Sequence, residues 1–252
     1  MKPKIVAVHL LNDFSGSPMV LSQALKGLQK SGHEVVIHTA GGREGFLSDI
    51  DCKKNYFTYK FFQNPLLRLM AFLISQLVVF SQLMRYRKEN VVIYVNTLLP
   101  FGAALAGKVM GKKVVYHIHE SYIKPIALKK FLKGVASVTA DTAVYVSNYL
   151  CEAEKISNIK HKVVYNALPD EFVSKAEGFK YHIPTANSFT VLMVCSLKEY
   201  KGINEFISLA NRHPKLKFEM VLNAEKEDIT NYFTEKGIPS NVSLFPTQKN
   251  LD

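Results

Sequence analysis

Apolar runs typical of buried strands recur along the first two thirds of the chain, and helical patterns separate several of them. Such alternation favours βαβ units and a mainly parallel sheet. The strand-like runs lie at 5–10, 35–39, 91–95, 114–119, 137–139, 144–146 and 163–165. We therefore predict one complete α/β domain over residues 1–168.

The first helix of this domain is marked at both ends. Ser17 suits an N-cap with Pro18 at the first helical position, and Ser31-Gly32 suits the end. The helix face between them is apolar, formed by Val20, Leu21, Ala24, Leu25 and Leu28. Residues 12–18 thus connect a strand to a helix, and the backbone N–H groups of such a loop suit an anion. The loop lacks the glycine patterns of dinucleotide and P-loop sites, so a simple capped turn is the alternative.

The segment 66–84 is the most hydrophobic in the chain and is about as long as a bilayer span. Arg68, Gln76 and Gln82 interrupt it, and a basic run at 85–88 is followed by a strand-like run. We predict a long core helix in preference to a transmembrane helix. A helix lying in the membrane interface is the intermediate alternative.

After Asn166 the pattern changes, and the polar stretch 169–189 is a candidate linker. A new alternation then predicts strands at 190–195, 217–222 and 242–245, with helices at 205–212 and 227–236. An open doubly wound sheet usually has about five or six strands. We therefore expect residues 190–252 to form only part of a second domain.

The net charge of +11 is unevenly distributed. Residues 1–168 carry 22 Lys and Arg against 10 Asp and Glu, a net charge of +12, whereas residues 169–252 carry 10 against 11. A basic domain can attract anionic lipid, nucleic acid or a phosphorylated substrate, or can simply be soluble. No nucleic-acid-binding motif accompanies the charge, so we do not expect nucleic acid as a partner.

The three cysteines are widely spaced and form no ligand motif, which indicates reduced thiols. The N-terminus has no pattern of a signal peptide. We therefore expect a cytoplasmic protein.

Two histidines and a carboxylate end the run 114–119. His117 and His119 are two residues apart, hence on one face of a strand, and Glu120 follows. A metal site is conceivable from these residue types, but no second pair with ligand spacing supports it. At the carboxyl end of a parallel strand a histidine is well placed to contact a ligand, while the other histidine is expected to be structural.

Two further loops carry candidate binding residues. Asn166 follows the run 163–165 and suits either a ligand contact or a local turn. Lys198 and Lys201 lie between the first strand and the first helix of the second domain. Lys201, just before a helix N-terminus, suits a phosphate, although a solvated loop lysine is the alternative.

In this order the features resemble the retaining, GT-B-fold glycosyltransferases of family 4, which transfer sugars from nucleotide-sugar donors. The resemblance spans essentially the whole chain. It rests on Gly16-Ser17, His119-Glu120, the helix opening at 146–149, the segment 164–168 and the lysine loop 197–202. It implies two Rossmann-like domains facing each other across a cleft, the first mainly for the acceptor and the second for the nucleotide sugar.

The resemblance also implies roles for single residues. His119 would meet the donor sugar near the reacting centre as the catalytic residue, and Lys201 would neutralise the departing diphosphate. The other donor or diphosphate contacts would be Gly16, Ser17, Lys198 and Asn166. Asp13 and Glu120 would lie on the acceptor side. Neither a cofactor nor a metal would be required, and the donor would be a UDP- or GDP-sugar.

Two departures from the family pattern affect these expectations. Cys195 and Ser196 occupy positions where the family commonly has Gly-Arg, so one diphosphate cation is expected to be absent or to be replaced by Lys198. The family's Glu-x7-Glu motif has no counterpart before Asp252. We therefore expect a truncated chain that is weakly active or inactive alone.

The expected activity is transfer with retention to a cell-surface polysaccharide, glycan or lipid-linked acceptor. It would take place at the inner face of an anionic membrane contacted peripherally by the basic domain. The alternative is a non-catalytic acceptor- or partner-binding half of a two-component transferase.

Overall fold

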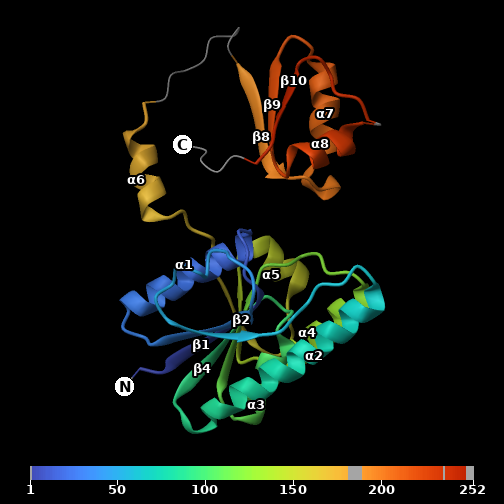
Figure 1. Cartoon of the computed structure of the whole chain (residues 1–252). Helices are drawn as coiled ribbons and strands as arrows, with labels where there is room; N and C mark the ends of the chain where they lie inside the picture. Colours follow the sequence, from blue (N-terminus) through green and yellow to red (C-terminus); the bar gives the residue numbers. More distant parts are fainter. Residues whose placement is uncertain (1, 181–188, 235, 248–252) are drawn as a thin grey trace. The chain divides into compact units, whose positions relative to one another are not determined.

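The computed structural model describes residues 2–180, 189–234 and 236–247. The chain divides into two compact units, Met1–Ala176 and Glu177–Asp252 (Figure 1). This boundary falls inside the segment 169–189 that the sequence suggests as a linker. Each unit is described by itself.

The first unit is built on a seven-stranded parallel sheet in the order β3-β2-β1-β4-β5-β6-β7 (Figure 1). Its strands are β1 (Lys4–Leu11), β2 (Val35–Ala40), β3 (Lys53–Phe57), β4 (Val91–Asn96), β5 (Lys113–Ile118), β6 (Thr142–Tyr145) and β7 (Lys160–Val163). Its helices are α1 (Gly16–Lys30), α2 (Pro65–Leu83), α3 (Phe101–Val109), α4 (Ile126–Thr139) and α5 (Asn148–Glu154), with a 3-10 turn at Met84–Lys88. Helix α6 (Asp170–Gly178) crosses the unit boundary.

Helices cover both faces of this sheet because successive strand residues point to opposite sides. Ile5 and Ala7 of β1 belong to a buried cluster with residues of α1. Val6 and Val8 belong to a larger cluster shared with α2, α3, α4 and α5. The central strands β1 and β4 are therefore buried on both sides, which explains their continuous apolar sequences.

The second unit contains the parallel strands β8 (Thr190–Ser196), β9 (Lys217–Asn223) and β10 (Val242–Phe245) in the order β10-β9-β8. A 3-10 turn (Glu199–Lys201), helix α7 (Ile203–Arg212) and helix α8 (Lys226–Phe233) accompany them. Phe218, Met220 and Leu222 of β9 pack with both helices in a separate core. This is a partial second Rossmann-like domain, as the sequence predicts.

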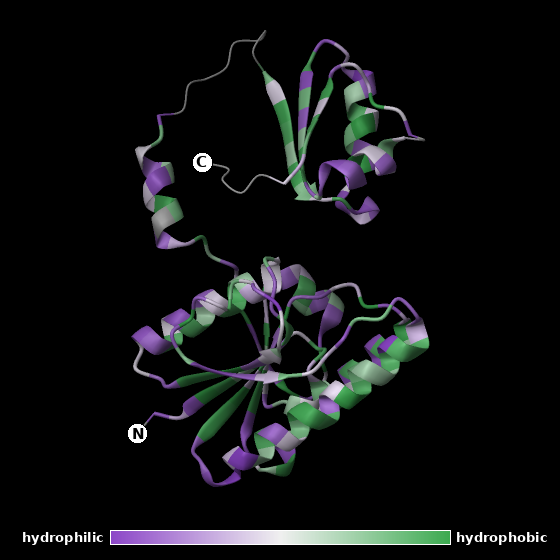
Figure 2. Ribbon diagram, in the orientation of Figure 1, coloured by the Kyte–Doolittle hydropathy of each residue, from purple (hydrophilic) through white to green (hydrophobic). Residues whose placement is uncertain are grey.

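Helix α2 departs from the prediction of a core helix. It has the length and composition of a membrane span, yet only 28% of its most apolar window is buried. Figure 2 shows α2 coloured as hydrophobic along most of its length, whereas α1 alternates between hydrophobic and hydrophilic residues. The prediction is wrong because hydropathy reports how apolar a helix is and not which face it buries.

Four other local predictions need correction. The run 137–139 is the last turn of α4, in which Thr139 continues the buried face formed by Leu132 and Ala136 while Val138 is exposed. Strand β3 is absent from the prediction, because its Lys53-Lys54-Asn55 start is polar at a sheet edge. The N-cap of α1 is Ser15, so Ser17 already lies inside the helix.

The fourth correction concerns the candidate linker. The structure forms helix α6 in its first half, where the sequence suggests only a polar stretch. Residues 181–188 of that segment lie outside the described residues, as do residues 248–252 of the second domain.

Candidate active site

Polar side chains gather where the three central strands of the first sheet end. His9 lies on β1, Asn96 ends β4, and His117 lies on β5 with His119 just beyond it. Asn96 of β4 pairs with His117 of β5, and Val8 of β1 pairs with Val95 of β4. His9, Asn96 and His117 are therefore neighbours on one face of the sheet. This is the carboxyl edge, where ligands bind in open α/β sheets.

The amide of Asn96 connects this cluster and is fully buried. Its Nδ2 donates to the backbone carbonyl of Ser17 over 3.1 Å and lies 3.1 Å from Nδ1 of His9. Because a carbonyl can only accept, this contact fixes the orientation of the amide. Its Oδ1 therefore faces Nε2 of His119 at 2.9 Å, and Nε2 must carry the proton of that ring.

His117 packs beside His119, with ring centroids 4.3 Å apart. Its Nδ1 lies 2.8 Å from the hydroxyl of Tyr94. Its buried Nε2 has no hydrogen-bond partner among the described residues. Such an unpaired group is uncommon in a folded protein and marks this part of the sheet as unusual.

Burial keeps these imidazoles neutral. Loss of solvent lowers the pKa of His9 and of His117 to about 4. The pKa of His119 falls to about 3, first through burial and then through the positive charge that His117 and His9 would add. At neutral pH the site therefore offers hydrogen-bonding imidazole and not imidazolium.

Glu120 lies beside this cluster, and burial raises the pKa of its carboxyl group. The backbone N–H of His119 donates to its Oε2 over 3.3 Å, and a hydrogen bond with the Thr97 side chain also opposes the shift. Thr97 itself adopts a left-handed backbone conformation, with φ of 72°. Strained residues of this kind concentrate at functional sites.

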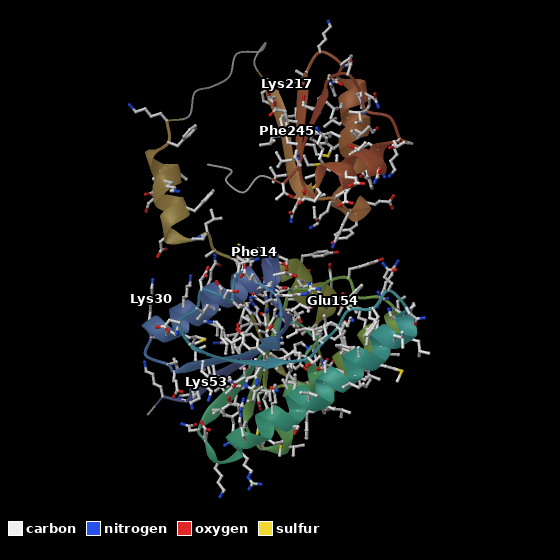
Figure 3. The ribbon with its side chains drawn as sticks, viewed as in Figure 1. Phe14, Lys30, Lys53, Glu154, Lys217 and Phe245 are labelled. Carbon is white, nitrogen blue, oxygen red and sulfur yellow. The ribbon has the colours of Figure 1, made fainter. Side chains whose placement is uncertain are left out.

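The loop from β1 to α1 is held in place on one side and open on the other. The Asp13 carboxylate accepts from the N–H of Ser15 over 3.0 Å, a turn that leads into the helix. Gly45 lies so close that a Cβ there would come within 2.4 Å of the Asp13 backbone nitrogen. A Cβ on Gly16 would meet nothing within 4 Å, so a ligand can approach its backbone closely. Phe14, labelled in Figure 3, lies in the same loop.

The lysine loop belongs to the second unit. Lys198 and Lys201 are exposed. Lys198 precedes the 3-10 turn that follows β8, and Lys201 is the last residue of that turn. Gly202 adopts φ of +86° and caps α7, whose first residue is Ile203. Lys201 lies two residues before Ile203, which confirms the prediction that it comes just before a helix N-terminus. Its ammonium lies 5.3 Å from the centroid of the Tyr200 ring.

Asn166 is placed less close to a strand end than the sequence suggests. Strand β7 ends at Val163, so Asn166 lies three residues beyond it and is exposed. In the sheet order β6 separates β7 from β5, which puts about 10 Å between those two strands. The structure thus brings Ser17 and His119 together, joined by Asn96, while Asn166 follows a different strand.

No group of three His, Cys, Asp or Glu that could hold a metal ion occurs among the residues that the structure describes. All three cysteines are free thiols.

Residues 14–172, more than half of the chain, match the family model of Glycosyltransferase Family 4. This chain belongs to that family. The resemblance to the GT-B glycosyltransferases of this family is therefore confirmed. The match covers Asn96, His117 and His119 of the glycosyltransferase and begins after His9. No curated protein sequence matches the glycosyltransferase significantly.

Solved structures similar to this glycosyltransferase share its GT-B fold. HepE from Anabaena in complex with UDP is 18% identical, with a TM-score of 0.66, over 98% of this chain and 70% of that one. A glycosyltransferase from Rickettsia africae is also 18% identical, with a TM-score of 0.60, over 98% and 69%. A UDP-GlcNAc 2-epimerase from Neisseria meningitidis is 15% identical, with a TM-score of 0.57, over 98% and 73%. The epimerase illustrates that the fold alone does not define the reaction.

Two residues of the cluster escape reasoning from sequence. His9 and Asn96 each lie at the end of an apolar strand-like run, and no local motif marks them. A signal does exist, since polar residues near the carboxyl ends of two buried parallel strands meet at the same sheet edge. Applying that rule to residues 9 and 96 would have placed both beside His119.

Proposed function

We propose that this chain transfers a sugar, with retention, from a UDP- or GDP-sugar to a glycan or lipid-linked acceptor of cell-surface polysaccharide. The reaction would take place in the cytoplasm, at the inner face of the membrane. One observation carries the proposal: a neutral His119 is held by Asn96 at the carboxyl edge of the sheet, beside the first turn of α1.

His119 would orient the donor sugar without supplying charge. Its Nε2–H donates to Asn96, which leaves Nδ1 as an acceptor for a sugar hydroxyl. A fixed, neutral ring discriminates between hydroxyl positions because a wrongly placed hydroxyl leaves a buried group unpaired. Its pKa of about 3 makes proton transfer by His119 at neutral pH a poor fit.

The second unit would stabilise the leaving nucleoside diphosphate. As the sugar departs, negative charge accumulates on the diphosphate, and cations and free N–H groups lower the barrier. Lys198, Lys201 and the first turn of α7 supply both kinds of group. In the first unit, the backbone of Gly16 and Ser17 would add donor or diphosphate contacts. On the acceptor side, Asp13 and Glu120 are the carboxylates that flank the cluster.

Calorimetric titration of the chain with UDP, GDP and their sugars tests the donor role. Lys201→Ala should weaken binding about tenfold or more, because a charge-assisted contact to phosphate is lost. Lys215→Ala is the matched control, since Lys215 is also exposed but precedes β9, at the amino end of the parallel strands, whereas Lys201 follows the carboxyl end of β8. Equal effects of the two changes would contradict the assignment.

Transfer itself is measured with labelled donors and by NMR of the product anomer. His119→Ala should lower turnover and leave the affinity for the free nucleoside diphosphate unchanged. Low turnover of the unaltered chain is expected, whereas inversion at the anomeric carbon would contradict retention. A chain that binds acceptor but no nucleotide sugar would instead be the acceptor-binding half of a two-component enzyme.

A further inference from the structure

Helix α2 turns its apolar side chains outward. The exposed residues recur at the spacing of one helix face, with Leu66 66%, Ile74 56% and Leu77 70% exposed. Leu67, Leu69, Met70 and Leu73 are exposed as well. Several neighbouring large apolar side chains on one surface mark an interaction site far more often than a single exposed leucine does.

The opposite face of α2 contains its buried polar residues. Gln76 Oε1 accepts from the N–H of Gly102 over 3.0 Å, and its Nε2 donates to Ser75 Oγ over 3.1 Å. Gly102 also lies so close to α2 that a Cβ would come within 2.2 Å of the Gln76 carbonyl oxygen. The rotation of α2 is therefore set by buried hydrogen bonds and a tight backbone contact. Its outward leucines cannot be buried by turning the helix.

The apolar surface continues onto α4. A groove of about 620 Å³ is lined by residues of both helices, among them Leu69, Phe72, Leu73, Leu128 and Phe131. Phe131 is 50% exposed and packs edge-on against Phe101, with ring centroids 5.2 Å apart. The two helices thus present one continuous apolar surface, which we call the α2–α4 face.

The charged side chains of the segments that form this face are all cationic. Residues 58–88 and 121–139 contain no Asp or Glu. Arg68 and Lys124 line the groove itself. Lys129 and Lys133 of α4 pair with Glu154 of α5, labelled in Figure 3, and so contribute less charge to the face.

We propose that the α2–α4 face docks onto an anionic lipid bilayer, with α2 lying in the interface plane and not crossing it. Apolar area buried among the acyl chains and attraction between the cations and anionic headgroups both favour this occupant. A second copy is a poorer occupant, because it would bring its own cations against Arg68 and Lys124. The inference rests on the membrane location proposed above but not on the nucleotide chemistry.

The chain contains no tryptophan, so one substitution creates a single fluorescent probe. Leu77→Trp places it at the most exposed position of the α2–α4 face, and Ile238→Trp places it at an exposed site of the second unit. Adding phosphatidylcholine vesicles with about a third phosphatidylglycerol should shift the emission of Leu77→Trp to shorter wavelength and leave Ile238→Trp unchanged. Unchanged emission from Leu77→Trp, or equal shifts in both variants, would overturn the proposal.

Co-sedimentation with the same vesicles measures affinity. Ile74→Glu should weaken binding about tenfold or more, since an apolar side chain is replaced by a charge that anionic lipid repels. Ile238→Glu makes the same chemical change elsewhere and should have no effect. Binding should also weaken in high salt and on vesicles of phosphatidylcholine alone. Equal binding by the two variants contradicts the proposal.

Two further measurements separate the alternatives. Sedimentation of the chain without lipid should give a monomer, whereas a dimer that Ile74→Glu dissociates would assign the face to a second copy. Nucleotide titration of Ile74→Glu should match that of the unaltered chain, which also shows that the variant is folded. If the unaltered chain binds no nucleotide but binds vesicles, the transferase proposal fails and the docking surface stands.

Discussion

Acid should unfold this protein at a pH where its carboxylates still carry most of their charge. His9, His38 and His117 have pKa values lowered to about 4 by burial, and His119 has one of about 3. In the unfolded chain each titrates near 6.5. The unfolded state therefore binds more protons between about pH 4 and 6.5, so the stabilisation is complete above that range and is lost as the pH falls.

The size of the effect follows from the pKa values. At pH 5, which is about 1.5 units below the unfolded pKa, each of the four neutral histidines lowers the free energy of unfolding by about 2 kcal/mol relative to its value above about pH 6.5. Together they account for about 8 kcal/mol, comparable with the whole stability of a typical domain. Glu120 acts with the opposite sign. Because its pKa is raised in the folded state, the folded state takes up its proton at a higher pH than the unfolded state, and this uptake stabilises the fold as the pH falls.

Urea unfolding followed by circular dichroism at closely spaced pH values measures this directly. Near pH 5.3 the unfolding free energy should change by about 4 to 5 kcal/mol per pH unit, equivalent to three or four protons. His38→Gln, which removes a histidine held against Gln82 and Tyr86, should reduce that slope by about 1.4 kcal/mol, whereas the exposed His161→Gln should not. A slope of about one proton or less in the unaltered chain would refute the reasoning.

Other substitutions probe the packing of single elements. Gly102→Ala should lower the free energy of unfolding in urea by about 1–3 kcal/mol, because its methyl group meets the Gln76 carbonyl. Gly134→Ala has open space in α4 and should raise it by about 0.5–1 kcal/mol. Ser147→Ala should cost about 1 kcal/mol because it removes the capping bond of α5. Ser15→Ala should cost less in the same assay, since the Ser15 side chain makes no capping bond to α1.

Elements that are buried on both sides could be predicted from the sequence, whereas the edge strand and the orientation of a helix could not. The continuous apolar runs of β1 and β4 predicted central parallel strands because both faces of those strands are buried. Strand β3 was missed because it pairs only with β2, and its polar start matches no strand pattern. Helix α2 was predicted as a helix but with the wrong exposure, since the contact that orients it involves residue 102, far along the chain.

The candidate site, like the fold, was predictable only in part. His119 and Glu120 could be found from their position after a strand, and the loop at Gly16 from the strand-to-helix transition. The hydrogen bonds through Asn96 could not, because they depend on strand register and on the orientation of one amide. Retention and the extent of the whole enzyme stay predictions.

The buried amide of Asn96 also constrains how this protein can evolve. It contacts positions 9, 17 and 119, which come from three separate parts of the chain, and its hydrogen bonds with Ser17 and His119 have fixed polarity. An aspartate at position 96 would have no N–H to offer Ser17, so the first turn of α1 would have to change with it. Among descendants of a common ancestor, positions 9, 96 and 119 should therefore be exchanged as a set and seldom singly.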